Sequence, residues 1–178
     1  DLNKNLLKGY KLQLMYMKSR KQYSTALEIC DKILEINELE IDTLVKKMYM
    51  LNERRQSNKV LSMAEKLLKK FPKNLNILFQ MGLAANIVKN YHKGRDCFEE
   101  VIKFSPNHIA ALKNLQVAYH YTNQSFEKLQ ILNKLKKMQI FLGSHINKEI
   151  KTIKEIISRG EFLKIEEKVE GITPQAED

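Results

Sequence analysis

Histidine, cysteine and serine are among the side chains of this sequence that could carry catalysis or bind a metal. The four histidines are His92, His108, His120 and His145, and none of them lies three or four residues from another histidine or from a cysteine. Ligands at those spacings share one face of a helix, so the sequence offers no helical metal pair. It also contains no glycine-rich phosphate loop and no serine nucleophile elbow. We therefore expect a protein that is not an enzyme and that has no cofactor.

The two cysteines, Cys30 and Cys97, are expected to be structural. Asp96 precedes Cys97, and a neighbouring carboxylate opposes the ionisation that makes a thiol reactive. Both cysteines are predicted to be small buried hydrophobic residues rather than a disulfide pair. His92 lies beside a predicted inter-helix turn and His108 at a predicted repeat junction, so we expect both histidines at the solvent-exposed surface.

A period of 34 residues organises the chain. Pro72 and Pro106 are separated by this interval, and three further sets of apolar or small residues follow it. These sets are Ala26, Val60 and Gly94; Cys30, Ala64 and Phe98; and Ile33, Leu67 and Val101. A fixed period of this length is typical of helix pairs that stack on one another. The elements that must position any functional residue are therefore helices.

Residues 75–108 show the predicted helix pair most clearly. Apolar and small residues at intervals of three or four predict one amphipathic helix before Lys89 and another after Asn90. The first set is Leu78, Met81, Gly82 and Ala85, and the second is Tyr91, Gly94, Phe98 and Val101. Pro106 ends the second helix, because proline cannot donate the next helical hydrogen bond.

These residues resemble the tetratricopeptide repeat. The matches to its pattern in residues 75–108 are Leu78, Met81, Gly82, Gly94, Phe98, Val101 and Pro106, while Ala85 replaces the usual aromatic residue. The resemblance implies an all-α fold, a right-handed α-solenoid of four helix pairs. The four repeats are placed at residues 7–40, 41–74, 75–108 and 109–142.

Other positions also depart from the pattern of this repeat, among them Lys47 in the second repeat. Glu38 replaces the proline of the first repeat, Met48 replaces the glycine of the second, and Lys128 stands where a small residue packs in the fourth. We expect Asn37 to form the turn that the proline would form. Met48 is expected to pack the helices less closely than glycine would.

The sequence beyond Gly143 no longer follows the repeat. Ser144 is a suitable N-cap for a helix, and Gly160 is a suitable stop. The apolar face of this helix is formed by Ile146, Ile150, Ile153 and Ile157. We expect residues 143–170 to form either a single capping helix or a degenerate fifth pair, whose second helix would carry Phe162, Ile165 and Val169. Residues 171–178 are predicted to be a flexible tail.

The resemblance also implies where a partner binds. In tetratricopeptide repeats the first helices line a concave groove, and the equivalent positions here form an apolar, partly aromatic strip with lysines towards both ends. The candidate partner-binding residues are Lys11, Met15, Val45, Lys46, Tyr49, Phe79, Leu83, Lys113, Val117 and Tyr121. Leu12, Gln80 and Asn114 share the repeat position of Lys46. We predict a scaffold or adaptor that holds a peptide or helix of a protein partner with apolar anchors and some acidic residues.

Two alternatives to an open groove are compatible with the sequence. The strip would be core if the repeat frame slips by one residue, or the C-terminal segment could fold back and fill the groove. Chaperone-tail recognition through the carboxylate clamp of this family is not expected. Only Lys11 matches among the equivalent positions, which are Lys11, Met15, Lys46, Asn76 and Gln80.

The net charge of +10 suggests a different class of partner. Nucleic acid or an anionic membrane surface could contact the lysines towards the C-terminal end, which are Lys128, Lys134, Lys136, Lys137, Lys148, Lys151 and Lys154. Arginine, the usual bidentate phosphate ligand, is scarce there, and no interleaved aromatic residues accompany the lysines. We therefore rank this alternative below protein binding.

The sequence says little about compartment. No apolar run approaches the roughly 20 residues that a membrane-spanning helix needs. The chain opens with Asp1 rather than Met, so we expect the start of the natural protein, and any targeting segment in it, to be missing. The cytoplasm is the favoured compartment, and no oligomeric state is predicted.

Overall fold

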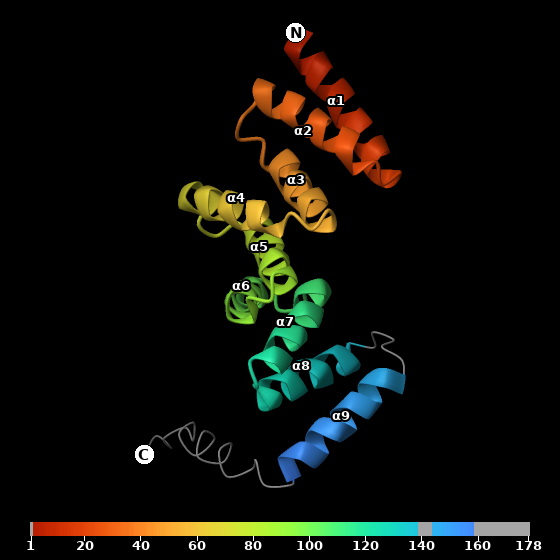
Figure 1. Cartoon of the computed structure of the whole chain (residues 1–178), viewed down its shortest axis with the longest axis vertical. Coiled ribbons are helices and arrows are strands. Elements are labelled where there is room, and N and C mark those ends of the chain that lie inside the picture. The colour runs from red at the N-terminus through yellow and green to blue at the C-terminus, as the bar shows by residue number, and fades with distance from the viewer. Residues whose placement is uncertain (1, 139–143, 159–178) are drawn as a thin grey trace, which may run out of the picture. The chain divides into compact units, whose positions relative to one another are not determined.

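The secondary structure is helical throughout the residues that the computed structural model describes, 2–138 and 144–158 (Figure 1). The first six helices are α1 (Leu2–Ser19), α2 (Tyr23–Ile36), α3 (Ile41–Glu53), α4 (Ser57–Lys70), α5 (Leu75–Ile87) and α6 (Tyr91–Phe104). They are followed by α7 (Ile109–Tyr121), α8 (Ser125–Lys137) and α9 (Ser144–Ile156). The predicted all-α fold of repeated helix pairs is confirmed.

The chain divides into an N-terminal unit, Asp1–Phe104, and a C-terminal unit, Ser105–Asp178. In the N-terminal unit α1 pairs with α2, α3 with α4 and α5 with α6, and α2 and α4 each also pack against the helix that follows them. In the C-terminal unit α7 pairs with α8, and α9 packs against α8. The predicted second capping helix around Phe162 and the predicted tail at 171–178 lie outside the described residues. None of the described helices has the length and apolar character needed to cross a bilayer.

The turn inside each helix pair has the same backbone geometry. Positive φ angles of 56°, 60°, 64° and 57° occur at Lys21, Arg55, Lys89 and Asn123, which are spaced by 34 residues. In the third pair, Lys89 N–H donates to the Asn86 carbonyl and Asn90 N–H to the Ala85 carbonyl, and the other three turns repeat both bonds. This is the Schellman arrangement that ends helices. Asparagine tolerates the left-handed region better than lysine or arginine, so the first three turns carry more backbone strain than the fourth.

The junctions between repeats also follow the 34-residue period, with three different side chains as N-caps. Glu40 Oε2 accepts from Thr43 N–H at 2.6 Å, and Asn74 Oδ1 accepts from Ile77 N–H at 3.1 Å. His108 Nδ1 accepts from Ala111 N–H at 3.1 Å. The prediction that His108 is a solvent-exposed surface residue is therefore wrong, because the imidazole is half-buried and caps α7.

Asn37 forms the first of these junctions, as predicted. Its Oδ1 accepts from Leu39 N–H at 3.3 Å, and its carbonyl accepts from Glu40 N–H at 3.2 Å. The asparagine side chain thus closes a local turn that brings Glu40 into the capping position. The first repeat ends without a proline for this reason.

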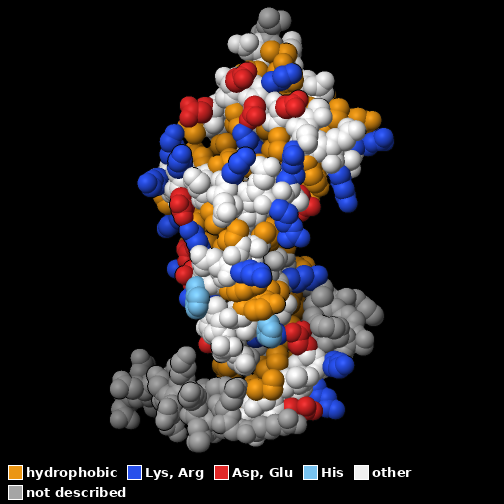
Figure 2. Space-filling model, viewed as in Figure 1, with side chains coloured by type: hydrophobic (Ala, Val, Ile, Leu, Met, Phe, Trp, Pro, Cys, Tyr) orange, Lys and Arg blue, Asp and Glu red, His pale blue; other side chains and the backbone are white. Residues whose placement is uncertain are grey.

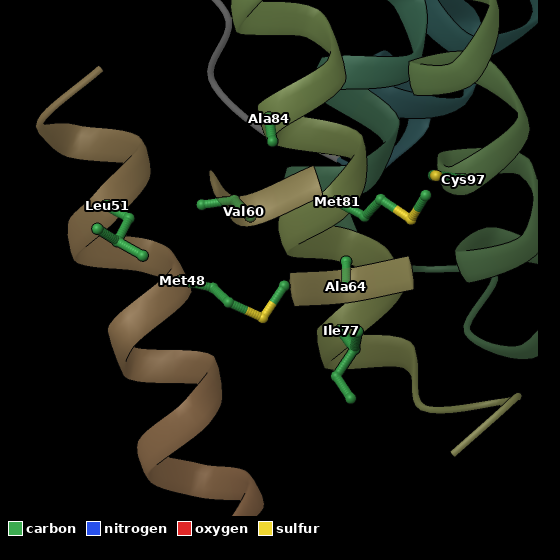
Figure 3. Packing of buried hydrophobic residues seen from close by; sticks show 8 residues of the cluster. All are labelled: Met48, Leu51, Val60, Ala64, Ile77, Met81, Ala84 and Cys97. Atoms are coloured by element: carbon green, nitrogen blue, oxygen red, sulfur yellow. The ribbon is translucent and has the colours of Figure 1, made fainter. Parts of the chain in front are cut away.

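A hydrophobic cluster joins α3, α4, α5 and α6 (Figure 3). Its members are Met48 and Leu51 on α3, Val60 and Ala64 on α4, Ile77, Met81 and Ala84 on α5, and Cys97 on α6. Met48 is completely buried in this cluster. A long, flexible thioether therefore occupies the space between the helices where the repeat pattern has a glycine.

Gly82 on α5 allows a close approach of α6. A Cβ at this position would lie 2.8 Å from Cε1 and Cζ of Phe98, a distance that a real Cβ essentially never shows. The Phe98 ring is fully buried, so it packs directly on the α5 backbone. This contact gives the glycine and the aromatic residue of the third repeat their structural role.

Both cysteines are buried and free of disulfide bonds, as predicted. Burial raises the pKa of the Cys30 thiol to about 12 and that of the Cys97 thiol to about 11. Asp96 adds to the shift at Cys97, but burial is the larger cause. Neither thiol is available as a thiolate near neutral pH, so both act as hydrophobic packing residues.

Candidate partner-binding surface

The predicted partner-binding residues lie on the first helix of each pair. Lys11 and Met15 are on α1, Val45, Lys46 and Tyr49 on α3, Phe79 and Leu83 on α5, and Lys113, Val117 and Tyr121 on α7. The first seven belong to the N-terminal unit and the last three to the C-terminal unit.

The side chains at these positions range from exposed to half-buried. Met15 is 63% exposed and Tyr121 57% exposed, and Lys113 is also exposed. The other seven predicted residues are half-buried. In contrast Gln80, which shares the repeat position of Lys46, is only 7% exposed. The expectation that Gln80 faces an open groove is therefore wrong.

The buried Gln80 pairs with Asn52, a buried polar residue that sequence reasoning missed. Asn52 Nδ2 donates to the Gln80 carbonyl at 3.1 Å and to Gln80 Oε1 at 3.3 Å, which joins α3 to α5. Asn52 is itself only 4% exposed. No sequence signal identifies this pair, since an asparagine and a glutamine on a helix are ordinarily solvated.

Tyr49 is held in place by two neighbours from the first helix pair. Its ring packs edge-on against Tyr23, with centroids 6.4 Å apart and planes at 90°, and the Lys18 ammonium lies 4.7 Å from its centroid. A hydrogen bond with Tyr23, together with burial, raises the pKa of Tyr49 to about 12. The contacts with Tyr23 and Lys18 thus fix the orientation of the Tyr49 ring.

Phe79 and Val45 each use one side in packing within the N-terminal unit. The Phe79 ring lies 5.8 Å from the Phe98 ring, at an interplanar angle of 64°. Val45 packs against the cluster of Figure 3. Both side chains nevertheless keep part of their surface accessible. Their apolar area is divided between the core and the surface of the first helices.

The lysines at the N-terminal end of the strip are engaged in ion pairs. Lys11 Nζ donates to Glu40 Oε1 at 2.5 Å, and Lys46 donates to Asp42. Burial of Glu40 opposes its ionisation, but hydrogen bonds from Lys11 and Thr43 overcome this and lower the pKa of its carboxyl group. Lys11 therefore supports the cap of α3 and contributes less free positive charge to a partner than the sequence indicates.

The basic stretch near the C-terminal end is also partly engaged. Lys128 is buried and pairs with Glu149, and Lys134 donates to the Pro106 carbonyl at 2.5 Å. The side chains of Lys136, Lys151, Lys154 and Glu155 are among those that line a shallow hollow of about 610 Å³. Figure 2 shows basic and acidic side chains interspersed on the visible face of α9. Two of the seven lysines predicted to contact an anionic partner, Lys128 and Lys134, are thus engaged in contacts within the unit.

No metal centre accompanies these surfaces in the part of the chain that the structure describes. Among those residues, histidine, cysteine, aspartate and glutamate form no group of three or more that could hold a metal ion. His92 is exposed on α6 and His120 is exposed on α7. The described surface offers side chains for packing, hydrogen bonding and ion pairing.

Comparison with known proteins gives the class of fold. No family model and no curated protein matches the chain. Among solved structures, MamA residues 41–end from Desulfovibrio magneticus RS-1 is similar with a TM-score of 0.67, at 15% identity over 78% of each chain. The thermophilic TPR protein TTC0263 of Thermus thermophilus is similar with a TM-score of 0.66, at 11% identity over 86% of this chain and 83% of that one.

A third similar structure is that of Naa15/Naa10 bound to HypK-THB. The matched chain has a TM-score of 0.61 and 19% identity, over 90% of this chain and 25% of that one. The three matches together show that this chain has the tetratricopeptide-type helical repeat fold. At these identities the similarity establishes the fold alone.

Proposed function

We propose that this chain is a non-catalytic interaction module, a scaffold or adaptor whose first helices hold a segment of a partner protein. The observation that carries the proposal is a set of partly exposed apolar side chains at one repeat position, Met15, Tyr49 and Leu83. The residues that directly follow the last two, Met50 and Ala84, are completely buried. Because the partly exposed residue and the buried residue after it differ in this way, the predicted repeat frame is favoured over a repeat frame shifted by one residue.

The chemistry of these positions favours an apolar segment over a highly charged one. Tyr49 and Phe79 are aromatic side chains fixed by ring contacts, so they lose little side-chain entropy when a partner covers them. Lys11 and Lys46 are already paired with carboxylates. We therefore expect apolar anchors of the partner to supply most of the affinity, and its acidic residues to add little on this unit.

The proposal is tested with peptides selected by phage display on the whole chain. Affinity of a selected peptide is measured for wild type and for Met15→Ala/Leu83→Ala, which truncates two accessible side chains without touching the Tyr49 packing. We expect this double variant to lose about tenfold or more in affinity. The matched control is Leu39→Ala, an exposed apolar residue in the α2–α3 junction. Equal affinity of all three proteins for every selected peptide would rule out this groove.

A second candidate function is contact with an anionic polymer through Lys136, Lys151 and Lys154. These three lysines line one hollow, which is the observation in its favour. The test measures retention of single-stranded RNA by wild type and by the triple Lys→Gln variant across a salt series. If the three lysines contact phosphates, the slope of log K against log salt concentration should be about 2 less steep for the triple variant than for wild type. An unchanged slope excludes this function.

A further inference from the structure

The turns inside the three helix pairs of the N-terminal unit lie along one side of it, which we call the turn edge. Its three segments are residues 18–25, 52–59 and 86–93. Arg54 Nη1 of the second segment donates to Ser24 Oγ of the first at 2.8 Å. Leu51, Val60 and Ala84, which border the second and third segments, belong to one hydrophobic cluster (Figure 3). The three turns therefore follow one another along the same edge.

Positive charge is concentrated on the turn edge. Its segments carry eight basic residues against the single acidic residue Glu53, a net charge of +7, while the whole chain has +10. The eight are Lys18, Arg20, Lys21, Arg54, Arg55, Lys59, Lys89 and Lys93. Six of the eight are exposed. Among the described residues, Lys93 is the one of the eight that pairs with a carboxylate, that of Glu65.

The opposite edge of the same unit, formed by the junctions between repeats, has no such uniform charge. Residues 35–42 contain four acidic residues and no basic one, while residues 69–76 contain three lysines and no acidic one. The turn edge is positive in all three repeats, so its charge is more than a general abundance of lysine. Arg54 and Arg55 are exposed although a helix pair precedes them and another follows them. Their exposure therefore does not depend on where the sequence begins.

Backbone strain indicates that these basic side chains replace a more stable choice. Lys21, Arg55 and Lys89 have φ angles of 56°, 60° and 64°, where glycine or asparagine is the ordinary residue. The fourth turn has Asn123 there. A cation is stabilised at a helix C-terminus but destabilised at an N-terminus, and each of these turns joins one to the other. Because strained positions are typical of functional sites, a ligand explains the three cations better than turn stability does.

The side chains of the turn edge favour a phosphate polymer over a protein segment. Val88 is the one large apolar side chain of the three segments that is exposed, whereas protein interfaces centre on apolar and aromatic anchors. Packed helices such as α3 and α5 lie about 8–10 Å apart, so the cations form a row that a linear polyanion can follow. The guanidinium group binds phosphate through two parallel hydrogen bonds. Three of the five arginines in the chain lie on this edge, Arg20, Arg54 and Arg55.

We infer that the turn edge of the N-terminal unit binds the phosphate backbone of a nucleic acid strand. The arginines of the first two turns contact phosphates, and Lys21, Lys59 and Lys89 add point charges along the row. Because phosphates carry no base identity, this binding is independent of nucleotide sequence. None of the eight cations is among the predicted groove residues or lines the hollow on α9. The turn edge is thus a binding surface additional to the proposed protein-binding strip.

The probe for this site is a fluorescein-labelled single-stranded RNA of roughly 20 uridines, longer than a typical single-strand binding site. Fluorescence anisotropy follows its binding to the full chain across a salt series. The variant is Lys21→Asn/Arg55→Asn/Lys89→Asn, which gives each turn the residue of the fourth turn. Asparagine tolerates positive φ, so the variant should be at least as stable as wild type, which circular dichroism and urea denaturation check.

The matched control is Lys66→Gln/Lys69→Gln/Lys70→Gln, which removes three exposed lysines of α4 that lie outside the turn edge. The expected result is that the slope of log K against log salt concentration is about 2 less steep for the turn variant than for wild type. The affinity of the turn variant at low salt should fall by about tenfold or more. The control variant should keep the wild-type slope and stay within about threefold of its affinity at moderate salt, where distant charges are screened.

Four results would overturn the inference. One is absence of RNA binding by wild type at protein concentrations up to about 0.1 mM at low salt. Another is an equal slope for wild type and the turn variant, since any RNA contact would then lie elsewhere, for example at the hollow on α9. The third is an equal loss of affinity in the control variant, because net charge alone would then explain binding. The fourth is tighter binding to polyglutamate or to phosphatidylserine vesicles than to RNA, because the partner would then be an acidic protein or a membrane surface.

Discussion

Lys128 Nζ on α8 lies 2.5 Å from Glu149 Oε1 on α9, and the lysine is only 4% exposed. The equivalent positions in the other repeats are Ala26, Val60 and Gly94, all small or medium apolar residues that are buried. In the fourth repeat the side chain at this position forms an ion pair with the helix that follows. The ion pair adds to a small apolar contact, in which Leu132 packs with Ile150 and Ile153. The departure from the repeat pattern at Lys128 thus specifies the docking of α9.

Removing the negative partner should weaken this docking. Glu149→Gln leaves the buried ammonium without its counter-charge, which costs several kcal/mol for a fully buried pair. Because Glu149 is partly exposed, we expect a loss of about 2 kcal/mol in the free energy of opening α9. Hydrogen exchange of the α9 amides measures this directly.

The matched variant is the double substitution Lys128→Met/Glu149→Met, which removes both charges and keeps most of the side-chain volume. An apolar replacement of a buried ion pair is often neutral or stabilising, so protection of α9 should change by less than about 1 kcal/mol. Equal loss of protection in both variants would mean that the ion pair does not direct the docking, and that packing volume at this position does.

Glycine should relieve the backbone strain of the residues with positive φ in the turns inside the helix pairs. Lys89 has a φ of 64°, a conformation that costs a residue with a side chain about 1 kcal/mol or more relative to glycine. Lys89→Gly should therefore raise the free energy of unfolding by about 0.5–1 kcal/mol after its own entropic cost. Lys66→Gly, in the interior of α4, should lower it by about 1 kcal/mol. Chemical denaturation distinguishes these signs, and destabilisation by both substitutions would contradict the strain at Lys89.

The second helices of three pairs begin without a side-chain cap, and an asparagine at the N-cap position should stabilise them. Gln22, Gln56 and Gln124 make no capping hydrogen bond, whereas Asn90, at the same repeat position, accepts from Lys93 N–H at 3.2 Å through Oδ1. Gln56→Asn should stabilise the chain by about 0.5–1 kcal/mol. Asn74→Ala, which deletes an existing cap, should destabilise it by about 1 kcal/mol. No gain from Gln56→Asn in urea denaturation would show that the longer amide is already satisfied by water.

The Glu40 cap should make stability depend on pH. The pKa of its carboxyl group is lowered in the folded chain, so the unfolded state binds the proton more tightly. The ionised cap therefore stabilises the fold above the ordinary carboxyl pKa, and this stabilisation is lost as pH falls through the folded value. Glu40→Gln should cost about 1 kcal/mol at pH 7.

The difference between wild type and Glu40→Gln should shrink as the pH falls below about 4. Denaturation midpoints of both proteins across pH 3–7 measure it. Glu38→Gln is the control, because Glu38 is exposed in the same junction, and it should stay within about 0.5 kcal/mol of wild type. A constant difference between wild type and Glu40→Gln across this range would show that the charge of Glu40 is unimportant.

The apolar side of the fold could be predicted from spacing because burial follows helix periodicity. Ala26, Cys30, Ile33 and Phe98 are all completely buried, and each was placed by the 34-residue period alone. The polar contacts could not be predicted in this way. Lys128 meets Glu149 only because α9 docks where it does, and His108 caps α7 only because its Nδ1 faces Ala111. A side-chain hydrogen bond depends on rotamers and on distant neighbours, which a single sequence does not contain.

The central claim is that the first helices of the repeats present a surface for a protein segment, and methyl NMR tests it most directly. A peptide selected on the whole chain is titrated while the methyl signals of Met15, Val45 and Leu83 are followed together with those of Ile36 and Leu39. Shifts that are largest at Met15, Val45 and Leu83 are predicted. Shifts confined to Ile36 and Leu39, with the first-helix methyls unchanged, would contradict the proposed function.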